Sequence, residues 1–282
     1  MSSSSRPCGR KSSSVRTEQV TSAQNPKIKN LLALQEKSRT RREQGLFVVE
    51  GRRELGHALE AGFRPRTLFI READLEALTE LTAQAGSVNP DCLAVTLPSQ
   101  LYAKIAYREG TEGIIAVLET RPLSLEDLQL GAVPLIVVLE SVEKPGNLGA
   151  VLRSADAARA DAVIVCDPLT DLWNPNLIRA SLGGVLTVPT VCATSEETIA
   201  WLRARGIRIL TAQLQDSSWY YDTDMTGGTA LVMGPESTGL TDCWRRAADA
   251  HIRIPMLGRL DSLNVSVSAA ILLFEAVRQR NN

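Results

Sequence analysis

The chain has 282 residues, 44% of them hydrophobic, and its 31 basic and 32 acidic side chains give a net charge of −1. This length suffices for two domains, and the composition excludes fibrous and largely disordered classes of protein. The five cysteines are scattered without a Cys-x-x-Cys pair and only two histidines are present, so we expect neither disulfides nor a metal site. No apolar run approaches the roughly 20 residues that span a bilayer, so we expect a cytoplasmic protein.

The charges are unevenly distributed along the chain. Residues 1–53 hold 12 Lys and Arg against 4 Asp and Glu, whereas the remaining residues hold 19 against 28. A basic arm of this kind is the expected electrostatic footprint of a nucleic-acid partner, although a solvated tail explains residues 1–16 equally well. Residues 1–20 are rich in Ser, Arg and Lys and poor in large apolar groups, which predicts a disordered basic tail.

Residues 21–120 are expected to form a small α/β domain, because short apolar strands alternate with helical patterns. The predicted strands are 47–49, 66–70, 92–97 and 113–118, and the predicted helices begin near residues 25, 50, 75 and 99. A basic run follows the first helix, and its charges either lie at the solvated end of that helix or bind phosphate. The candidate RNA contacts are Lys37, Arg39, Arg41, Arg42 and Arg52.

Residues 121–133 read as a linker with a helical turn between Pro122 and Pro134, and residues 134–282 read as a second domain. Its predicted strands are 135–139, 162–166, 188–191, 207–212, 229–234 and 251–255, with helices between them and a last helix at 265–279. Regular alternation of strand and helix predicts a parallel sheet that helices cover on both faces.

Three short motifs stand where predicted strands of the second domain give way to loops or helices. They comprise Asn147, Gly149 and Arg153, then Gly234, Glu236 and Gly239, then the run 254–266 with Ile-Pro-Met and Ser-Leu-Asn-Val-Ser. Polar residues at the entrance of the last helix are often ordinary caps. A Pro- and Gly-containing loop that runs into small polar residues instead indicates close approach of the backbone to a ligand.

In order and spacing, the motifs resemble the three signature motifs of the SpoU (TrmH-like) branch of the SPOUT RNA 2′-O-methyltransferases, over about residues 25–280. The resemblance implies an α/β chain with an N-terminal, ribosomal-protein-like RNA-binding domain and a C-terminal catalytic domain with a parallel sheet and a trefoil knot. It also implies a homodimer, paired through the catalytic domain, that methylates ribose 2′-hydroxyls with S-adenosyl-L-methionine.

The two-domain layout favours 23S rRNA as the substrate, as in enzymes of this family that include antibiotic-resistance methyltransferases. A tRNA methyltransferase is the alternative within the family. A catalytically idle RNA-binding or ribosome-assembly module is the alternative from another functional class.

The resemblance also implies roles for individual residues. The expected catalytic residues are Arg153, Asn147, Glu236, Asn264 and Ser266. Because an arginine rarely gives up its proton, we favour Arg153 as a clamp on phosphate and developing charge over a general base. Glu236 either shapes its turn or contacts substrate. The expected cofactor-binding residues are Leu231, Met233, Gly234, Gly239, Ile254, Met256, Ser262 and Leu263.

Overall fold

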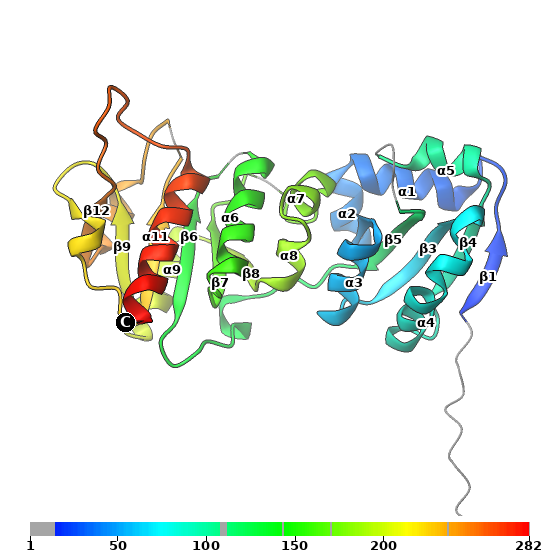
Figure 1. Ribbon diagram of the computed structural model, residues 1–282, viewed down its shortest axis with the longest axis horizontal. Helices are drawn as coiled ribbons and strands as arrows, with labels where there is room; N and C mark the ends of the chain where they lie inside the picture. The colour runs from blue at the N-terminus through cyan, green and yellow to red at the C-terminus, as the bar shows by residue number, and fades with distance from the viewer. Residues whose placement is uncertain (1–14, 108–111, 143, 170, 236, 282) are drawn as a thin grey trace, which may run out of the picture. The chain divides into compact units, whose positions relative to one another are not determined.

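The computed structural model describes residues 15–107, 112–142, 144–169, 171–235 and 237–281 (Figure 1). The chain divides into two compact units, of which the first ends at Glu119 and the second begins at Thr120. Each unit is described by itself below.

The first unit is built on a five-stranded sheet in the order β1-β4-β3-β5-β2. The strands are β1 (Arg16–Gln19), β2 (Leu46–Glu50), β3 (Pro65–Arg71), β4 (Leu93–Leu97) and β5 (Ile114–Glu119). The helices are α1 (Pro26–Glu36), α2 (Ser38–Gln44), α3 (Arg52–Glu60), α4 (Thr79–Val88) and α5 (Ser99–Ile105), with short 3-10 turns η1 (Glu72–Asp74) and η2 (Glu76–Leu78). Strands β1, β4 and β3 pair in parallel, whereas β5 runs antiparallel to β3 and β2.

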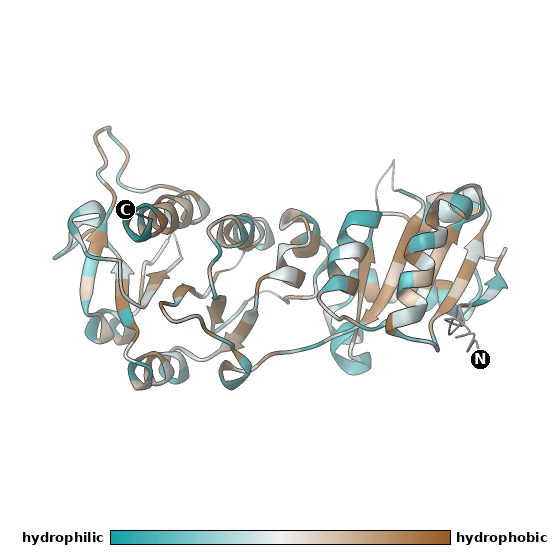
Figure 2. Cartoon of the chain, turned by 60° about the horizontal axis from the view of Figure 1, so that its bottom comes forward, coloured by the Kyte–Doolittle hydropathy of each residue, from teal (hydrophilic) through white to brown (hydrophobic). Residues whose placement is uncertain are grey.

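The first helix shows how sequence and packing agree in this unit. Asn25 caps α1 by accepting a hydrogen bond from the Lys27 amide, and a proline occupies the first turn, where its missing N–H is not needed. Ile28, Leu31 and Leu34 lie on one side of the helix and are fully buried. They pack against apolar residues of the central strands, which appear brown in Figure 2.

The predicted disordered tail is wrong at its C-terminal end, because residues 16–19 form β1. This strand pairs with β4 from Arg16 opposite Leu93 to Gln19 opposite Thr96. An edge strand is held by backbone hydrogen bonds, so it needs no apolar alternation that a sequence pattern would reveal. Residues 1–14 lie outside the described residues.

The second unit is built on a seven-stranded sheet in the order β10-β12-β9-β11-β6-β7-β8. The strands are β6 (Leu135–Glu140), β7 (Ala162–Cys166), β8 (Thr190–Ala193), β9 (Arg208–Ala212), β10 (Ser218–Trp219), β11 (Thr229–Met233) and β12 (Ala250–Arg253). The helices are α6 (Pro145–Ala157), α7 (Pro175–Ala180), α8 (Gly184–Thr187), α9 (Ser195–Ala204), α10 (Asp242–Ala247) and α11 (Val265–Arg280), with 3-10 turns η3 (Leu125–Asp127) and η4 (Tyr220–Asp222). Every strand pair of this sheet is parallel, which confirms the predicted parallel arrangement.

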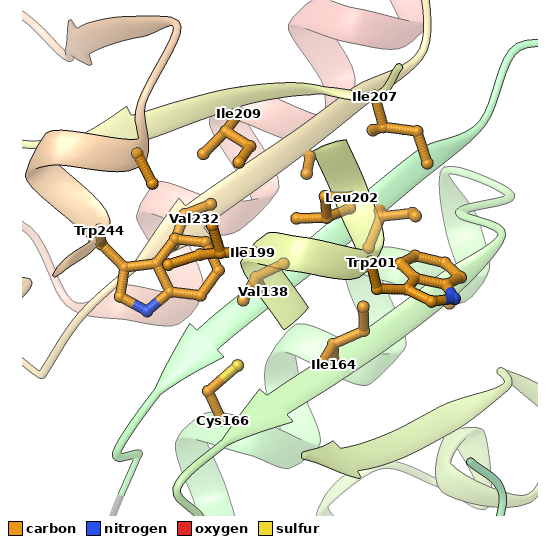
Figure 3. Close-up of a cluster of buried hydrophobic side chains, with 14 of the residues drawn as sticks. Val138, Ile164, Cys166, Ile199, Trp201, Leu202, Ile207, Ile209, Val232 and Trp244 are labelled. Atoms are coloured by element: carbon orange, nitrogen blue, oxygen red, sulfur yellow. The ribbon is translucent and has the colours of Figure 1, made fainter. Parts of the chain in front are cut away.

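Helices cover both faces of this sheet. On one face α9 and α10 bring Trp201, Leu202 and Trp244 into a buried cluster with residues from the strands (Figure 3). On the other face α6 and α11 pack side by side, and α11 also lies against β11. The central strand β6 is buried along its whole length, which explains why its sequence is an unbroken apolar run rather than an alternating one.

The segment 121–133 is not a free linker but an ordered part of the second unit. Leu123 forms a parallel bridge with Val191, and Leu128 is buried in the cluster under α9 and α10. Ser124 and Asp127 form a reciprocal cap around η3, and the hydrogen bonds from Ser124 lower the pKa of Asp127. The leucines spaced through this polar segment are what anchor it.

Among the residues that the structure describes, none of the helices combines the length and apolar character that crossing a bilayer requires.

Candidate functional site

The carboxyl ends of parallel strands meet at one edge of a sheet, which is where open α/β sheets bind ligands. In the second unit a cavity of about 320 Å³ lies at this edge. Its walls come from the segments that follow β9, β11 and β12 and from the first two turns of α11. Of the predicted cofactor-binding residues, those that line this cavity are Met233, Gly234, Gly239, Ile254, Met256, Ser262 and Leu263.

Leu231 is the exception among these candidates. It lies in the middle of β11, fully buried between Val137 of β6 and Leu210 of β9, and it is not part of the cavity wall. Side chains alternate between the two faces of a strand, so Met233 is the next residue on the same face as Leu231 and the one that reaches the strand end. The expectation that Leu231 touches a ligand in this cavity is therefore wrong.

The two glycines of the second motif are required by the way its loop closes. A Cβ on Gly234 would lie 2.7 Å from both the Gly239 carbonyl carbon and the Leu240 nitrogen, so any larger residue would push the loop apart. Gly239 itself has a φ of +67°, a conformation that other residues adopt only with strain. The predicted catalytic Glu236 lies outside the described residues.

Polar residues of the first and third motifs meet across the start of two helices. Asn264 caps α11 by accepting hydrogen bonds from the Ser266 amide (3.0 Å) and the Ser266 hydroxyl (2.6 Å). Its amide nitrogen donates to the Asn147 side-chain oxygen at 3.1 Å, in the first turn of α6. Three predicted catalytic residues are thus brought together although Asn147 and Asn264 are 117 positions apart.

Arg153 lies apart from these three residues along α6. An α-helix advances 1.5 Å and turns 100° per residue, so Arg153 stands about 9 Å along the axis and about 120° round from Asn147. Its side chain is exposed, and no acceptor among the described residues pairs with its guanidinium. The Arg153 guanidinium is therefore free to bind a ligand at a place separate from the Asn147–Asn264 pair.

Gly149, between these two residues on α6, is a packing requirement. A Cβ at this position would lie 2.5 Å from the Ala180 Cβ and 2.8 Å from the Ala180 carbonyl carbon. The absence of a side chain thus lets α6 approach α7 closely. The glycine of the first motif fixes where α6, and with it Arg153, stands.

Sequence reasoning missed a buried polar network that holds the second motif in place. Glu140, at the end of β6, is only 3% exposed and accepts hydrogen bonds from the Thr241 amide (2.9 Å) and hydroxyl (2.6 Å). Beside it, the Ser195 hydroxyl donates to Asp167 at 2.8 Å and accepts from the Trp244 indole at 3.0 Å. The sequence did offer a signal for this network, because Glu140 is a charged residue at the end of an apolar strand and lies just before the first motif.

The candidate RNA contacts of the first unit fall into three groups. Lys37, Arg39 and Arg42 are exposed, and Arg39 pairs with Glu43 one helical turn away. Arg52 is half-buried, and its backbone and side chain both donate to Glu112. The three exposed side chains can contact a polyanion directly. Arg52 is less accessible because Glu112 already engages it.

Arg41 does not fit the predicted role. It is 2% exposed and donates to the carbonyl oxygens of Leu34 (2.6 Å) and Gln35 (3.2 Å). The last carbonyls of a helix lack intrahelical partners, and Arg41 satisfies two of them at the end of α1. Its charge therefore stabilises the turn between α1 and α2 rather than binding phosphate.

Two buried thiols and the potential metal ligands were checked by their surroundings in the part of the chain that the structure describes. Burial raises the pKa of Cys166 to about 12 and that of Cys92 to about 11, so both stay protonated at neutral pH. Within the described ranges, no cluster of three or more His, Cys, Asp or Glu side chains is placed to hold a metal ion.

Comparison with known proteins identifies both units. A protein-family model described as SpoU rRNA Methylase family matches residues 134–274, and one described as MRM3-like substrate binding domain matches residues 25–116. A 23S rRNA (uridine(2479)-2'-O)-methyltransferase of Streptomyces viridochromogenes is 30% identical over 265 residues, covering 92% of this chain and 91% of the relative. The 23S rRNA (guanosine-2'-O-)-methyltransferase RlmB of Escherichia coli K12 is 34% identical over 246 residues, covering 85% and 92%.

The fold has solved counterparts over nearly the same length. An AdoMet-bound rRNA methyltransferase from Sinorhizobium meliloti superposes with a TM-score of 0.84 at 32% identity, covering 93% of this chain and 98% of that one. Both units of the present chain therefore lie within the matched length.

Proposed function

Because the chain belongs to the SpoU rRNA methylase family, we propose that it methylates a ribose 2′-hydroxyl of 23S rRNA with S-adenosyl-L-methionine as the methyl donor. The observation that carries this proposal is the cavity at the carboxyl edge of the second sheet, whose walls come from the second and third motifs. Relatives named for this reaction on 23S rRNA match the chain over most of its length.

The cavity suits S-adenosyl-L-methionine in its chemistry. Apolar Met233, Met256 and Leu263 can enclose the adenine ring, while backbone groups at Gly234 and Ile254 can bond its edge. The absence of a Cβ at Gly234 lets the backbone come close to a flat ligand. When bound, the cofactor supplies a methyl group activated by its sulfonium.

The polar residues at the start of α11 and α6 orient the acceptor. Asn264, Asn147 and Ser266 form a hydrogen-bonded group whose first member is exposed to solvent. Groups held this firmly can position a ribose hydroxyl for attack, and orientation alone can lower a reaction barrier by about 7–11 kcal/mol. Arg153 holds a phosphate next to that hydroxyl and stabilises charge that develops during transfer.

We further propose that two copies of the chain pair through the second unit. Val267 and Phe274 lie two turns apart on α11 with Ile271 between them, and they form an apolar stripe in which these two side chains are 46% and 47% exposed. An exposed stripe of this kind next to α6 favours a self-complementary interface. The separation of Arg153 from Asn147 supports a site in which the guanidinium comes from Arg153 of the partner subunit.

A trefoil knot in the C-terminal part completes the proposed fold. The last strand, β12, lies beyond β9, whereas α11 returns to pack on β11 and α6. The segment 254–264 must therefore cross the edge at which the loops after β9 and β11 stand (Figure 1). A crossing at this place supports a chain end threaded through a preceding loop.

The first unit is proposed to bind the RNA substrate. It matches the MRM3-like substrate binding domain, and Lys37, Arg39 and Arg42 are exposed along α2 and its start. We assign it the ribosomal-protein-like fold that the sequence resemblance implies, and we place the protein in the cytoplasm, where ribosomes are made. Resistance to a ribosome-targeting antibiotic stays a prediction, and drug susceptibility of a strain that lacks the protein tests it.

Transfer of a labelled methyl group tests the proposal directly. Purified protein is incubated with labelled S-adenosyl-L-methionine and either unmodified 23S rRNA or tRNA, and the modified nucleotide is mapped by primer extension at low nucleotide concentration. Label in 23S rRNA with one extension stop is the expected result. Label in tRNA alone would replace the substrate, and RNA binding without cofactor uptake would leave a non-catalytic module.

A further inference from the structure

Three aromatic side chains gather at the outer edge of the second sheet, next to the cavity. Trp219 and Tyr221 stack with ring centroids 6.4 Å apart and planes 20° from parallel. Tyr220 meets Tyr221 edge-on at 5.1 Å. Trp219 is 36% and Tyr221 46% exposed, so both rings have surface open to a ligand.

An arginine joins this aromatic pair to the cavity. Arg253 lies opposite Trp219 in the pairing of β12 with β10, and its guanidinium sits 4.2 Å from the centre of the indole ring. The same arginine lines the cavity. We call Trp219, Tyr221 and Arg253 the aromatic platform.

Arg253 has no hydrogen-bond acceptor among the described residues. Its Nε is sealed from solvent and unpartnered. Neighbouring arginines of this unit are engaged: Arg208 donates to Asp224, and Arg280 donates to carbonyl oxygens that include Met225 and Gly227. Buried donors are normally satisfied, so Arg253 is a guanidinium that the described residues leave unpaired, and its place in the cavity wall lets its terminal nitrogens meet an acceptor on a ligand.

We propose that the aromatic platform binds an unpaired nucleotide of the RNA substrate next to the methylated one, with the base stacked on the rings and its phosphate accepting from Arg253. Proteins read single-stranded RNA in this way, because every base has a face that stacks on aromatic rings and guanidinium planes. The inference rests on the proposed function. A carboxylate of the methyl donor offers Arg253 the same chemistry as a phosphate, so the experiment separates the two sources.

Variants of the full-length protein test the platform. Trp219→Ala and Tyr221→Ala remove a ring, while Trp219→Phe and Tyr221→Phe keep one and serve as matched controls. We measure the Kd for S-adenosyl-L-methionine by calorimetry, and the KM for RNA and kcat in methyl transfer. Loss of one stacked base is expected to raise the KM for RNA about 5- to 150-fold, with the cofactor Kd unchanged and the Phe variants within a few-fold of wild type.

Arg253→Ala separates the two acceptors. If RNA phosphate is the acceptor, this variant raises the KM for RNA and leaves the cofactor Kd within a few-fold. A cofactor Kd that rises as much as the KM for RNA, in this or the aromatic variants, overturns the platform in favour of a cofactor wall. Alanine variants with wild-type unfolding midpoints and an unchanged KM for RNA also overturn it. Methyl transfer by the wild type is scored separately, so the platform can fail while the proposed function stands.

Discussion

Asn264 illustrates how one side chain serves both structure and chemistry. Its side-chain oxygen accepts a hydrogen bond from the Ser266 amide in the first turn of α11, and its side-chain nitrogen donates to Asn147 of the first motif. The capping interpretation and the active-site interpretation of this position, which compete at the level of sequence, are both compatible with its contacts. Leu263 and Val265, the residues on either side of this cap, line the cavity, so the cap also helps to position part of the cavity wall.

The capping role of Asn264 can be measured apart from catalysis. Asn264→Ala removes the acceptor of the Ser266 amide and should lower the free energy of unfolding by about 1 kcal/mol. Asn264→Asp keeps an acceptor oxygen at the helix N-terminus and should stay within about 0.5 kcal/mol of wild type. Denaturant unfolding of the two variants checks this. Equal losses of stability would mean that the hydrogen bond to Ser266 is not what stabilises the helix end.

Arg153 is predicted to act on the transition state and not on the cofactor. Arg153→Ala should abolish methyl transfer, because α6 carries no second basic side chain that could replace the guanidinium. The Kd for S-adenosyl-L-methionine should stay within a few-fold of wild type. Arg159→Ala, at an exposed arginine just beyond the same helix, is the matched control and should retain activity. Wild-type turnover by the Arg153 variant would remove this residue from the site.

At this scale the sequence predicted which residues gather but not how each one points. The glycines and polar residues of the motifs carry a pattern, so the meeting of the second and third motifs at the cavity, and of Asn147 with Asn264, could be expected. Leu231 was misplaced because a sequence pattern does not show how far along a strand the cavity begins, and Arg41 because the pattern does not show that a basic side chain turns back onto helix carbonyls. Glu140 was missed because its partner Thr241 is 101 positions away.

Helix α6 is the element that ties motif, packing and site together. Its glycine at position 149 meets α7, and its first turn meets the cap of α11. Gly146 lies on the same helix, and a Cβ there would meet nothing within 4 Å. The two glycines therefore form a matched pair on one element.

Alanine at each position separates packing from helix propensity. Gly149→Ala forces a methyl group into Ala180 and should lower the free energy of unfolding by about 1–3 kcal/mol. Gly146→Ala should be neutral or stabilising by up to about 1 kcal/mol, because alanine favours a helix more than glycine does. Denaturant titration measures both values. Similar stability of the two variants would show that α6 and α7 can move apart without loss.

The core elements were predicted well because they are buried on both sides. An unbroken apolar run such as residues 135–139 has few alternatives to a central strand. The short edge strands β1 and β10 were not predicted, because edge pairing depends on backbone groups that all residues share. The ordered segment before β6 was read as a linker because its leucines are too few to form a pattern alone.

For the whole molecule, the excess of basic residues in the first 53 positions has a measurable consequence for RNA binding. If Lys37, Arg39 and Arg42 contact RNA phosphates, the logarithm of affinity should fall by roughly 0.7 per log unit of salt for each single-strand contact. Replacing all three by Ala should reduce the slope accordingly. The control Arg66→Ala, whose guanidinium pairs with Glu119, should leave it unchanged. A flat salt response of the wild type would exclude this arm from the RNA contact.

The proposed pairing through α11 is tested by introducing charge. Phe274→Asp places a carboxylate in the apolar stripe and should yield a monomer in sedimentation velocity, with methyl transfer lost because no partner supplies Arg153. Cofactor affinity should persist, since the cavity is lined by residues of one chain. Leu75→Asp, at an exposed leucine of the first unit, is the control. A monomeric wild type would contradict the proposal.

The walls of the cavity are drawn from positions between Ala212 and Leu272, and none comes from β6, β7 or β8, which are translated earlier. The cavity therefore forms only after the later strands of this unit and α11 have been translated and have folded. A nascent copy that has not yet folded α11 cannot enclose the cofactor. Loss of even the final helix by premature termination would produce a protein without a complete site, however well the earlier strands had folded.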